Sequence, residues 1–193
     1  MTLWYLSHPE VVIDPQVPVP EWGLSAVGRA RVERAAALRP WRPVARIVCS
    51  AETKAVETAQ ILAAASGATV EVRPDTGEND RSATGFVPPD EFERVADAFF
   101  ARPQESVRGW ETAAAAQTRI TGALADLLTR DDPTDLVVVG HGGVGTLWAC
   151  HLAGAPIARA WDQAGAGHVL AVDRGRGRLL HRWRPLEEVT VAA

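Results

Sequence analysis

The sequence predicts a single α/β domain in which a mostly parallel sheet lies between two layers of helices. Short apolar runs alternate along the chain with longer segments that have helical spacing, which is typical of β–α–β units. Helices cover both faces of such a sheet, so its strands read as nearly continuous apolar runs. The 193 residues, 47% hydrophobic and 23% charged, provide one well-buried core and leave little for a second domain.

Six short apolar runs are the predicted strands. Four of them are interpreted as buried strands, namely Leu3–Leu6, Val44–Cys49, Val70–Val72 and Leu136–Val139. Two further strands, His168–Val172 and Leu179–Trp183, are separated by Arg174–Gly177, whose two glycines favour a hairpin turn.

Five segments carry the signals of helices. Ser25–Leu38 begins with a serine, a preferred residue at helix starts, and Pro40 follows its end. Thr53–Ala65 stops just before Gly67. The remaining predicted helices are Pro89–Phe100, Thr112–Leu128 and Gly143–Leu152. The long irregular stretch 74–89 is expected to be functional, because structureless loops of this length are uncommon inside compact domains.

Polar side chains follow each of the first four predicted strands. Ligands of open α/β sheets gather at the carboxyl ends of the strands, so these side chains are expected to converge on one rim. They are Ser7, His8, Glu10, Ser50, Glu52, Lys54, Glu78, Asn79, Asp80, Arg81 and His141.

Two histidines at this rim indicate phosphoryl transfer. His141 precedes a glycine-rich helix start, where backbone N–H groups such as that of Gly142 favour anions and phosphate in particular. His8 occupies the equivalent position after the first strand, and a second imidazole at an anion site suggests a histidine nucleophile. Lys54, the only lysine of the chain, adds a positive charge.

Other phosphate chemistries fit the sequence less well. Gly140–Gly145 matches the GxGxxG pattern of dinucleotide-binding folds, but too little sequence follows it, and Asp162 does not end an apolar strand. Cysteine-based phosphatase chemistry lacks the required arginine, since Ala55 and Pro156 stand six positions after the two cysteines.

Four motifs, in order, resemble those of a known family. Leu6–Glu10 stands where the family has a strand followed by Arg-His-Gly, and Leu24–Gly28 matches its Leu-Ser-x-x-Gly helix start. Ser50–Ala59 fits Ser-x-x-x-Arg-Ala-x-x-Thr-Ala, with lysine in place of arginine, and Gly140–Gly143 reads Gly-His-Gly-Gly. Over about residues 2–155 the chain therefore resembles the histidine phosphatase superfamily, whose fold is phosphoglycerate-mutase-like.

The resemblance implies a role for each candidate residue. His8 is expected to attack phosphorus and form a phosphohistidine, while its other ring nitrogen donates to a backbone carbonyl. His141 is expected to stabilise the transition state, and Lys54 to supply charge to the phosphoryl oxygens. Glu78 is the expected acid that protonates the leaving oxygen and later activates water, with Asp80 as the alternative.

The chain departs from the family pattern beside His8. Ser7 replaces the first arginine of the motif, so a hydroxyl stands among the phosphate-binding groups instead of a charged fork. Pro9 replaces the glycine and removes one amide donor. Arg81 is a candidate to compensate. These departures leave two functions open, which are a histidine-type acid phosphatase acting on a small phosphomonoester and a degenerate, weakly active or non-catalytic binder of a phosphorylated ligand.

The remaining expectations concern the surroundings of the site. In the resembled family, the region that corresponds to about 74–112 caps the site, and Phe86 and Trp110 are candidates to line an apolar pocket there. No cofactor or metal is expected. The net charge of −4 argues against a nucleic-acid partner, and the absence of a long apolar stretch argues against a membrane span. Two cysteines in apolar contexts and no signal peptide predict a cytoplasmic protein, and assembly into a homo-oligomer is left open.

Overall fold

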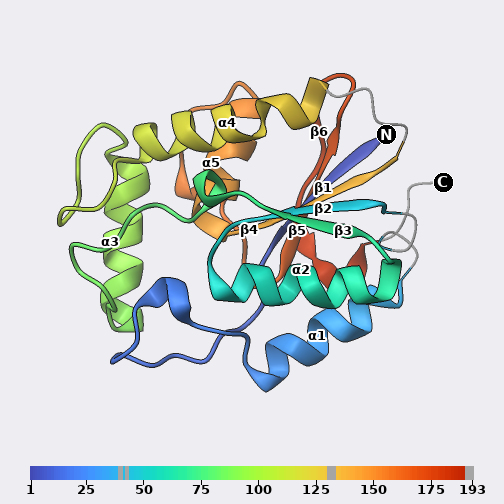
Figure 1. Cartoon of the computed structure of the whole chain (residues 1–193). Coiled ribbons are helices and arrows are strands. Elements are labelled where there is room, and N and C mark those ends of the chain that lie inside the picture. The colour runs from blue at the N-terminus through green and yellow to red at the C-terminus, as the bar shows by residue number, and fades with distance from the viewer. Residues whose placement is uncertain (39–40, 42–43, 130–133, 190–193) are drawn as a thin grey trace.

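A central six-stranded sheet organises the protein (Figure 1). The computed structural model describes residues 1–38, 41, 44–129 and 134–189. The strand order is β3-β2-β4-β1-β5-β6. Strands β1 to β4 pair in parallel, whereas β5 and β6 run antiparallel. The strands are β1 (Thr2–Ser7), β2 (Arg46–Cys49), β3 (Thr69–Val72), β4 (Leu136–Gly140), β5 (His168–Asp173) and β6 (Arg178–Pro185).

Helices cover both faces of this sheet, as Figure 1 shows. One face packs against α1 (Ala26–Ala36) and α2 (Thr53–Ser66), the other against α4 (Ala113–Thr129) and α5 (Gly142–Leu152). Because successive strand residues point to opposite faces, each central strand divides its apolar side chains between two cores. Tyr5 belongs to the core under α4 and α5, and its neighbours Trp4 and Leu6 belong to the core under α1 and α2. The predicted three-layer α/β fold is confirmed.

The predicted elements are all present, with ends that differ by one or two residues. Ser25 caps α1 by accepting the N–H of Gly28 at 3.0 Å. Gly67 ends α2 with a φ of +74°, a conformation that favours glycine. Arg174–Gly177 joins β5 to β6 as predicted. Short 3₁₀ helices that the sequence did not predict are η1 (Val19–Glu21), η3 (Pro74–Thr76), η4 (Arg159–Trp161) and η5 (Leu186–Glu188).

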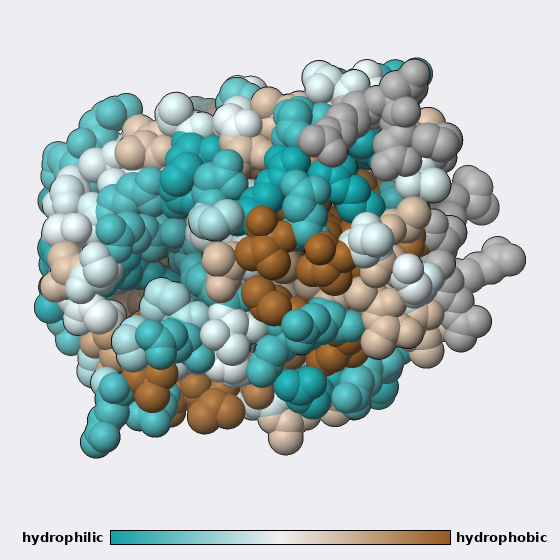
Figure 2. All heavy atoms as spheres, in the orientation of Figure 1, coloured by the Kyte–Doolittle hydropathy of each residue, from teal (hydrophilic) through white to brown (hydrophobic). Residues whose placement is uncertain are grey.

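The third strand is not the buried strand that the sequence predicted. It lies at the edge of the sheet beside β2, and Val70 and Val72 are 36% and 48% exposed. On the side of the molecule turned toward the viewer, Figure 2 shows exposed hydrophobic residues in the area where Figure 1 places β3. The apolar run is too short to reveal whether a strand lies at the centre or at the edge, since that depends on strand order.

The segment between β3 and α4 covers the end of the sheet to which the parallel strands point. Its helix α3 (Pro89–Ala101) stands across this end in Figure 1. Phe99, Phe100 and Trp110 join the same apolar cluster as Tyr5 and Trp148, so the segment packs on the core under α4 and α5.

Two further features concern the described part of the chain as a whole. None of its helices is both long enough and apolar enough to pass through a membrane. Cys49 and Cys150 are buried and unpaired, as their apolar contexts predicted.

Candidate active site

A cavity of about 480 Å³ lies between α3 and the carboxyl ends of the parallel strands. Its walls bring together groups that are distant in sequence, and His8, Glu78, Asn79 and Arg81 among them were predicted to share one rim. They include His8, Glu78, Asn79, Arg81, Gly142, Arg159 and Gln163, with Phe92, Phe99, Phe100 and Trp110 on the side of α3.

The two predicted histidines lie side by side at this end of the sheet, where His8 lines the cavity and His141 is fully buried. His8 follows β1 and His141 follows β4, and these strands are parallel neighbours in which Ser7 lies opposite Gly140. The backbone N–H of His8 also donates to the carbonyl of Gly140 at 3.0 Å. This register places the ring centroids 5.3 Å apart with an angle of 68° between the ring planes.

The environment of His8 keeps its imidazole neutral. Nδ1 lies 2.8 Å from the carbonyl oxygen of Pro9, the type of partner that the sequence led us to expect. Removal from water and the neighbouring His141 lower the pKa of His8 to about 3. With Nδ1–H donating to Pro9, the lone pair of Nε2 is available as a nucleophile.

His141 is fully buried and is held from two sides. Its Nε2 lies 2.7 Å from Ser50 Oγ and 3.3 Å from Glu52 Oε1. The hydroxyl of Tyr5 accepts the backbone N–H of His141 at 3.1 Å and donates to its carbonyl at 3.2 Å. Burial lowers the pKa of His141, although the charges of Glu52 and Glu78 oppose the shift. Among the described residues, His141 Nδ1 has no hydrogen-bond partner.

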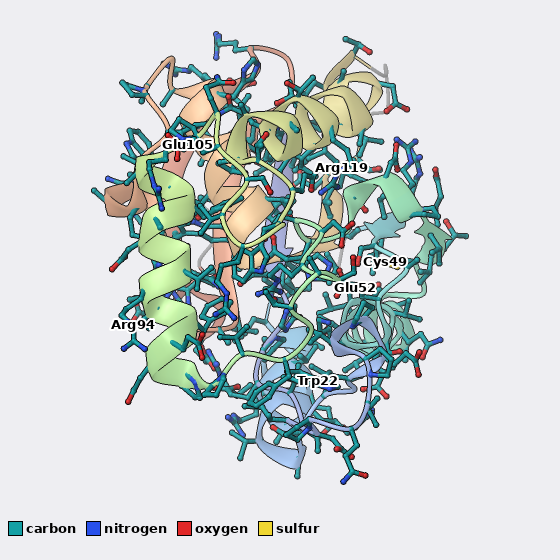
Figure 3. All side chains as sticks on the ribbon, turned by 90° about the vertical axis from the view of Figure 1, so that its left-hand side faces the viewer. Trp22, Cys49, Glu52, Arg94, Glu105 and Arg119 are labelled. Atoms are coloured by element: carbon teal, nitrogen blue, oxygen red, sulfur yellow. The ribbon has the colours of Figure 1, made fainter. Side chains whose placement is uncertain are left out.

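Lys54 is buried, with 2% of its surface exposed, rather than lying on the outside of α2. Its Nζ contacts Glu52 Oε2 at 2.5 Å and donates to the carbonyl of Val19 at 2.7 Å. Burial would raise the pKa of Glu52, but the charges of His141 and Lys54 outweigh it and lower this pKa to about 2. Glu52, labelled in Figure 3, had no role assigned from sequence, although a carboxylate two residues from the only lysine was a usable signal.

Glu78 lies at the start of α5. Its two carboxylate oxygens accept the N–H groups of Gly143 at 3.1 Å and Val144 at 3.0 Å. A Cβ on Gly143 would come within 2.7 Å of this carboxylate, so a side chain at that position would displace Glu78 from the start of α5. Arg119 of α4, labelled in Figure 3, donates to the carbonyls of Gly77 and Glu78 and thereby positions the loop.

Asp80, the alternative acid, does not share the position of Glu78 at the cavity. It is exposed and accepts the N–H of Ser82 at 2.8 Å. It does not line the cavity beside His8, whereas Glu78 does. Of the two predicted acids, the structure therefore brings Glu78 to the histidine pair.

Ser7 differs from its expected position. It is fully buried and does not line the cavity. Its Oγ lies 2.5 Å from Oε1 of Gln163 and accepts the backbone N–H of His168 at 3.0 Å. The Ser7 hydroxyl is thus already bonded to other groups, and Gln163, which the sequence did not single out, stands between it and the cavity.

A second cavity of about 250 Å³ also has His8 in its wall. His8, Lys54, Arg81 and Glu93 supply its polar side chains, and the rest of its wall is largely apolar, with Val11, Ile13, Trp22, Phe86, Val87, Phe92 and Trp110. Phe86 and Trp110, the two candidates named from the sequence, therefore line an apolar pocket, and Trp110 also packs into the core under α4 and α5. The guanidinium carbon of Arg81 lies 5.3 Å and 5.5 Å from the ring centroids of Phe92 and Trp110, at the junction of both cavities.

Candidate metal ligands were sought in the described ranges 1–38, 41, 44–129 and 134–189. Within these ranges, no group of three or more His, Cys, Asp or Glu side chains is placed to hold a metal ion.

The two buried imidazoles make stability depend on pH. The pKa of His8 in the folded protein is about 3, well below the ordinary histidine value of 6.5, and that of His141 is also lowered. The unfolded chain therefore binds more protons below pH 6.5, and the free energy of unfolding should fall with pH by up to about 1.4 kcal/mol per unit for each histidine. Urea unfolding at pH 7.5, 6.5 and 5.5 measures this slope, above the range in which Glu52 titrates.

A histidine variant separates this effect from general acid sensitivity. His8→Gln should have a shallower slope between pH 6.5 and 5.5, whereas His151→Gln, on an exposed position of α5, should keep the slope of the unaltered protein. Equal slopes in all three proteins would show that His8 is not held neutral by the fold.

Comparisons with known proteins identify the family of the chain. The chain matches the sequence model of the histidine phosphatase superfamily (branch 1) over residues 14–183. The match includes Lys54, Glu78 and His141 but begins after His8, so it does not depend on the altered motif. A search of curated proteins found no match.

Solved structures share the fold at low sequence identity. A mycobacterial glucosyl-3-phosphoglycerate phosphatase superposes with a TM-score of 0.77 at 20% identity, covering 95% of each chain. YhfR of Bacillus stearothermophilus gives 0.73 at 20% identity and 94% of each chain. TTHB049 of Thermus thermophilus gives 0.68 at 23% identity, covering 95% of this chain and 99% of that one. On the sequence match and the shared fold, the chain belongs to the histidine phosphatase superfamily.

Proposed function

We propose that the protein is a phosphatase that hydrolyses a phosphomonoester of a small molecule through a phosphohistidine on His8. The observation that carries this proposal is the pairing of a neutral His8 with His141, 5.3 Å apart, where His8 and Glu78 line the same cavity. Membership of the histidine phosphatase superfamily supports the same reaction class.

The groups around His8 suit a phosphoryl group. Two of the three Nζ–H donors of Lys54 are used by Glu52 and Val19, which leaves one for a phosphoryl oxygen. Arg81, in the loop before α3, lines both of the cavities that have His8 in their walls. A bound dianion favours the protonated form of His141, whose unpartnered Nδ1 then becomes a donor. These groups would stabilise the charge that develops on the phosphoryl oxygens.

The reaction would proceed in two displacements. In the first, Nε2 of His8 forms a bond to phosphorus while the bond to the leaving oxygen breaks, and Glu78 gives that oxygen its proton. In the second, Glu78 takes a proton from water, the water oxygen attacks phosphorus, and the Nε2–phosphorus bond breaks. Inorganic phosphate leaves, and Glu78 is protonated again.

The second cavity favours leaving groups with an apolar part. It opens beside His8, and most of its wall consists of aromatic and aliphatic side chains. Burial of such a group contributes about 25 cal/mol for each Å² removed from water. We therefore expect aryl and alkyl phosphates to be better substrates than sugar phosphates.

Chemical trapping tests the proposal directly. The purified protein, mixed with ³²P-labelled phosphomonoesters that include aryl, alkyl and sugar phosphates and quenched in alkali, should retain acid-labile label on His8. Release of inorganic phosphate should follow the same substrate order. If a ligand protects the protein against unfolding but no substrate labels His8 or releases phosphate, the alternative of a non-catalytic phospholigand-binding protein is correct and the proposal is wrong.

A further inference from the structure

Gln163 lies on the cavity wall with its backbone anchored to α5. Its N–H donates to Asp162 Oδ1 at 2.9 Å, and the same oxygen accepts the hydroxyl of Thr146, a residue of α5, at 2.9 Å. Arg159 Nε lies 3.1 Å from the other oxygen of Asp162. The residue is therefore held in place before any ligand arrives.

The buried hydroxyl of Ser7 determines which way the amide of Gln163 faces. The distance from Ser7 Oγ to Gln163 Oε1 is 2.5 Å, which suits an O–H···O hydrogen bond and is too short for an N–H donor. Ser7 Oγ accepts the N–H of His168 and has a single proton to donate, and the Gln163 oxygen at 2.5 Å is a much nearer acceptor for it than the carbonyl oxygen of His168 at 3.3 Å. The oxygen of the amide thus faces Ser7, and Nε2 faces away from it.

The Nε2 atom of Gln163 lies against the first residue of α5. A Cβ on Gly142 would come within 2.3 Å of it, so the absence of a side chain at position 142 makes room for this amide. None of the described residues accepts a hydrogen bond from Nε2. Two N–H donors are therefore open beside Gly142, in the cavity that contains His8.

We propose that Gln163 binds the phosphoryl group through its Nε2 donors, and that Ser7 is the positioning residue that keeps those donors turned toward it. The proposal rests on the proposed function for the identity of the anion. It assigns a neutral, preorganised donor pair to the part of the site next to position 7, where the chain has a serine instead of a charged residue.

The experiment measures the competitive inhibition constant of inorganic phosphate against p-nitrophenyl phosphate, and its Kd by calorimetry. Gln163→Ala should weaken phosphate binding at least about ten-fold, as expected for a lost hydrogen bond to a charged group, and Gln163→Glu should weaken it further through charge repulsion. Gln60→Ala, on the exposed side of α2, is the matched control and should change nothing.

Ser7 is tested by coupling to Gln163. Ser7→Ala should weaken phosphate binding in the unaltered chain, but should add less than about two-fold in the Gln163→Ala background, because the group that it positions is gone. A merely structural role of Ser7 would produce the same loss in both backgrounds and would overturn the positioning assignment.

The outcomes separate this inference from the proposed function. If the unaltered protein hydrolyses phosphomonoesters and Gln163→Ala binds phosphate equally well, the inference alone is wrong. If the unaltered protein binds phosphate without hydrolysing any ester, calorimetry on the same variants still decides the role of Gln163. If the unaltered protein does not bind phosphate at all, the inference is overturned.

Discussion

Replacement of His8 by alanine is expected to lower kcat for p-nitrophenyl phosphate by at least about four orders of magnitude. Loss of a covalent nucleophile removes the intermediate, and only binding and electrostatic stabilisation remain. The neighbouring His141 cannot substitute for His8, because its Nε2 contacts Ser50 and Glu52, and its Nδ1 has no lone pair once a bound dianion favours the protonated form. The measurement is the steady-state kcat of the unaltered protein and of His8→Ala, in an assay that can detect a rate about four orders of magnitude below that of the unaltered protein.

Two controls make the His8 result specific. His151→Ala, on the exposed surface of α5, should retain full activity. Calorimetry should show that His8→Ala still binds inorganic phosphate within a few-fold of the unaltered protein, since Lys54, Arg81 and His141 remain. Hydrolysis at the normal rate by a folded His8→Ala protein would mean that a different group attacks phosphorus.

Replacement of Glu78 by glutamine is expected to lower kcat by about 10²- to 10⁴-fold for alkyl phosphates, because an amide cannot donate the proton that the leaving alkoxide needs. The loss should be much smaller in the first displacement of p-nitrophenyl phosphate, whose phenolate leaves without protonation. Burst kinetics separate the two steps, since the second displacement still needs Glu78 to activate water. A burst of nitrophenol followed by slow turnover is the expected signature.

The rate of alkyl phosphate hydrolysis also decides whether Glu78 or Asp80 is the acid that protonates the leaving oxygen. Asp80→Asn should change alkyl phosphate hydrolysis by less than about three-fold, because Asp80 is exposed and does not line the cavity beside His8. The glutamine at position 78 keeps one oxygen to accept an N–H at the start of α5, so unfolding in urea should confirm that both variants fold. A larger loss in Asp80→Asn than in Glu78→Gln would reverse the assignment.

The altered motif around His8 has a structural explanation. Pro9 lacks the N–H of a glycine but keeps the carbonyl that His8 Nδ1 contacts. Ser7 is too short to reach the cavity, and its hydroxyl is bonded to Gln163 and to the backbone of His168. Two other positively charged side chains, Lys54 in the first turn of α2 and Arg81 in the loop before α3, line a cavity together with His8.

The order and type of the elements follow from local sequence alone. Apolar runs, helix caps such as Ser25 and stop signals such as Gly67 depend on neighbours within a few positions, so they are readable without a fold. The meeting of His8 and His141 was also predictable, because parallel strands end at the same edge of a sheet.

Strand order and side-chain direction were decided only by tertiary packing. The exposed position of β3 depends on which strand lies beside it, and that pairing is not local. Ser7 and Gln163 are 156 residues apart, and their contact exists because β1 and the loop before β5 lie side by side. Local patterns show which residues end a strand, but only the packing of distant segments determines where their side chains point and which partners they meet.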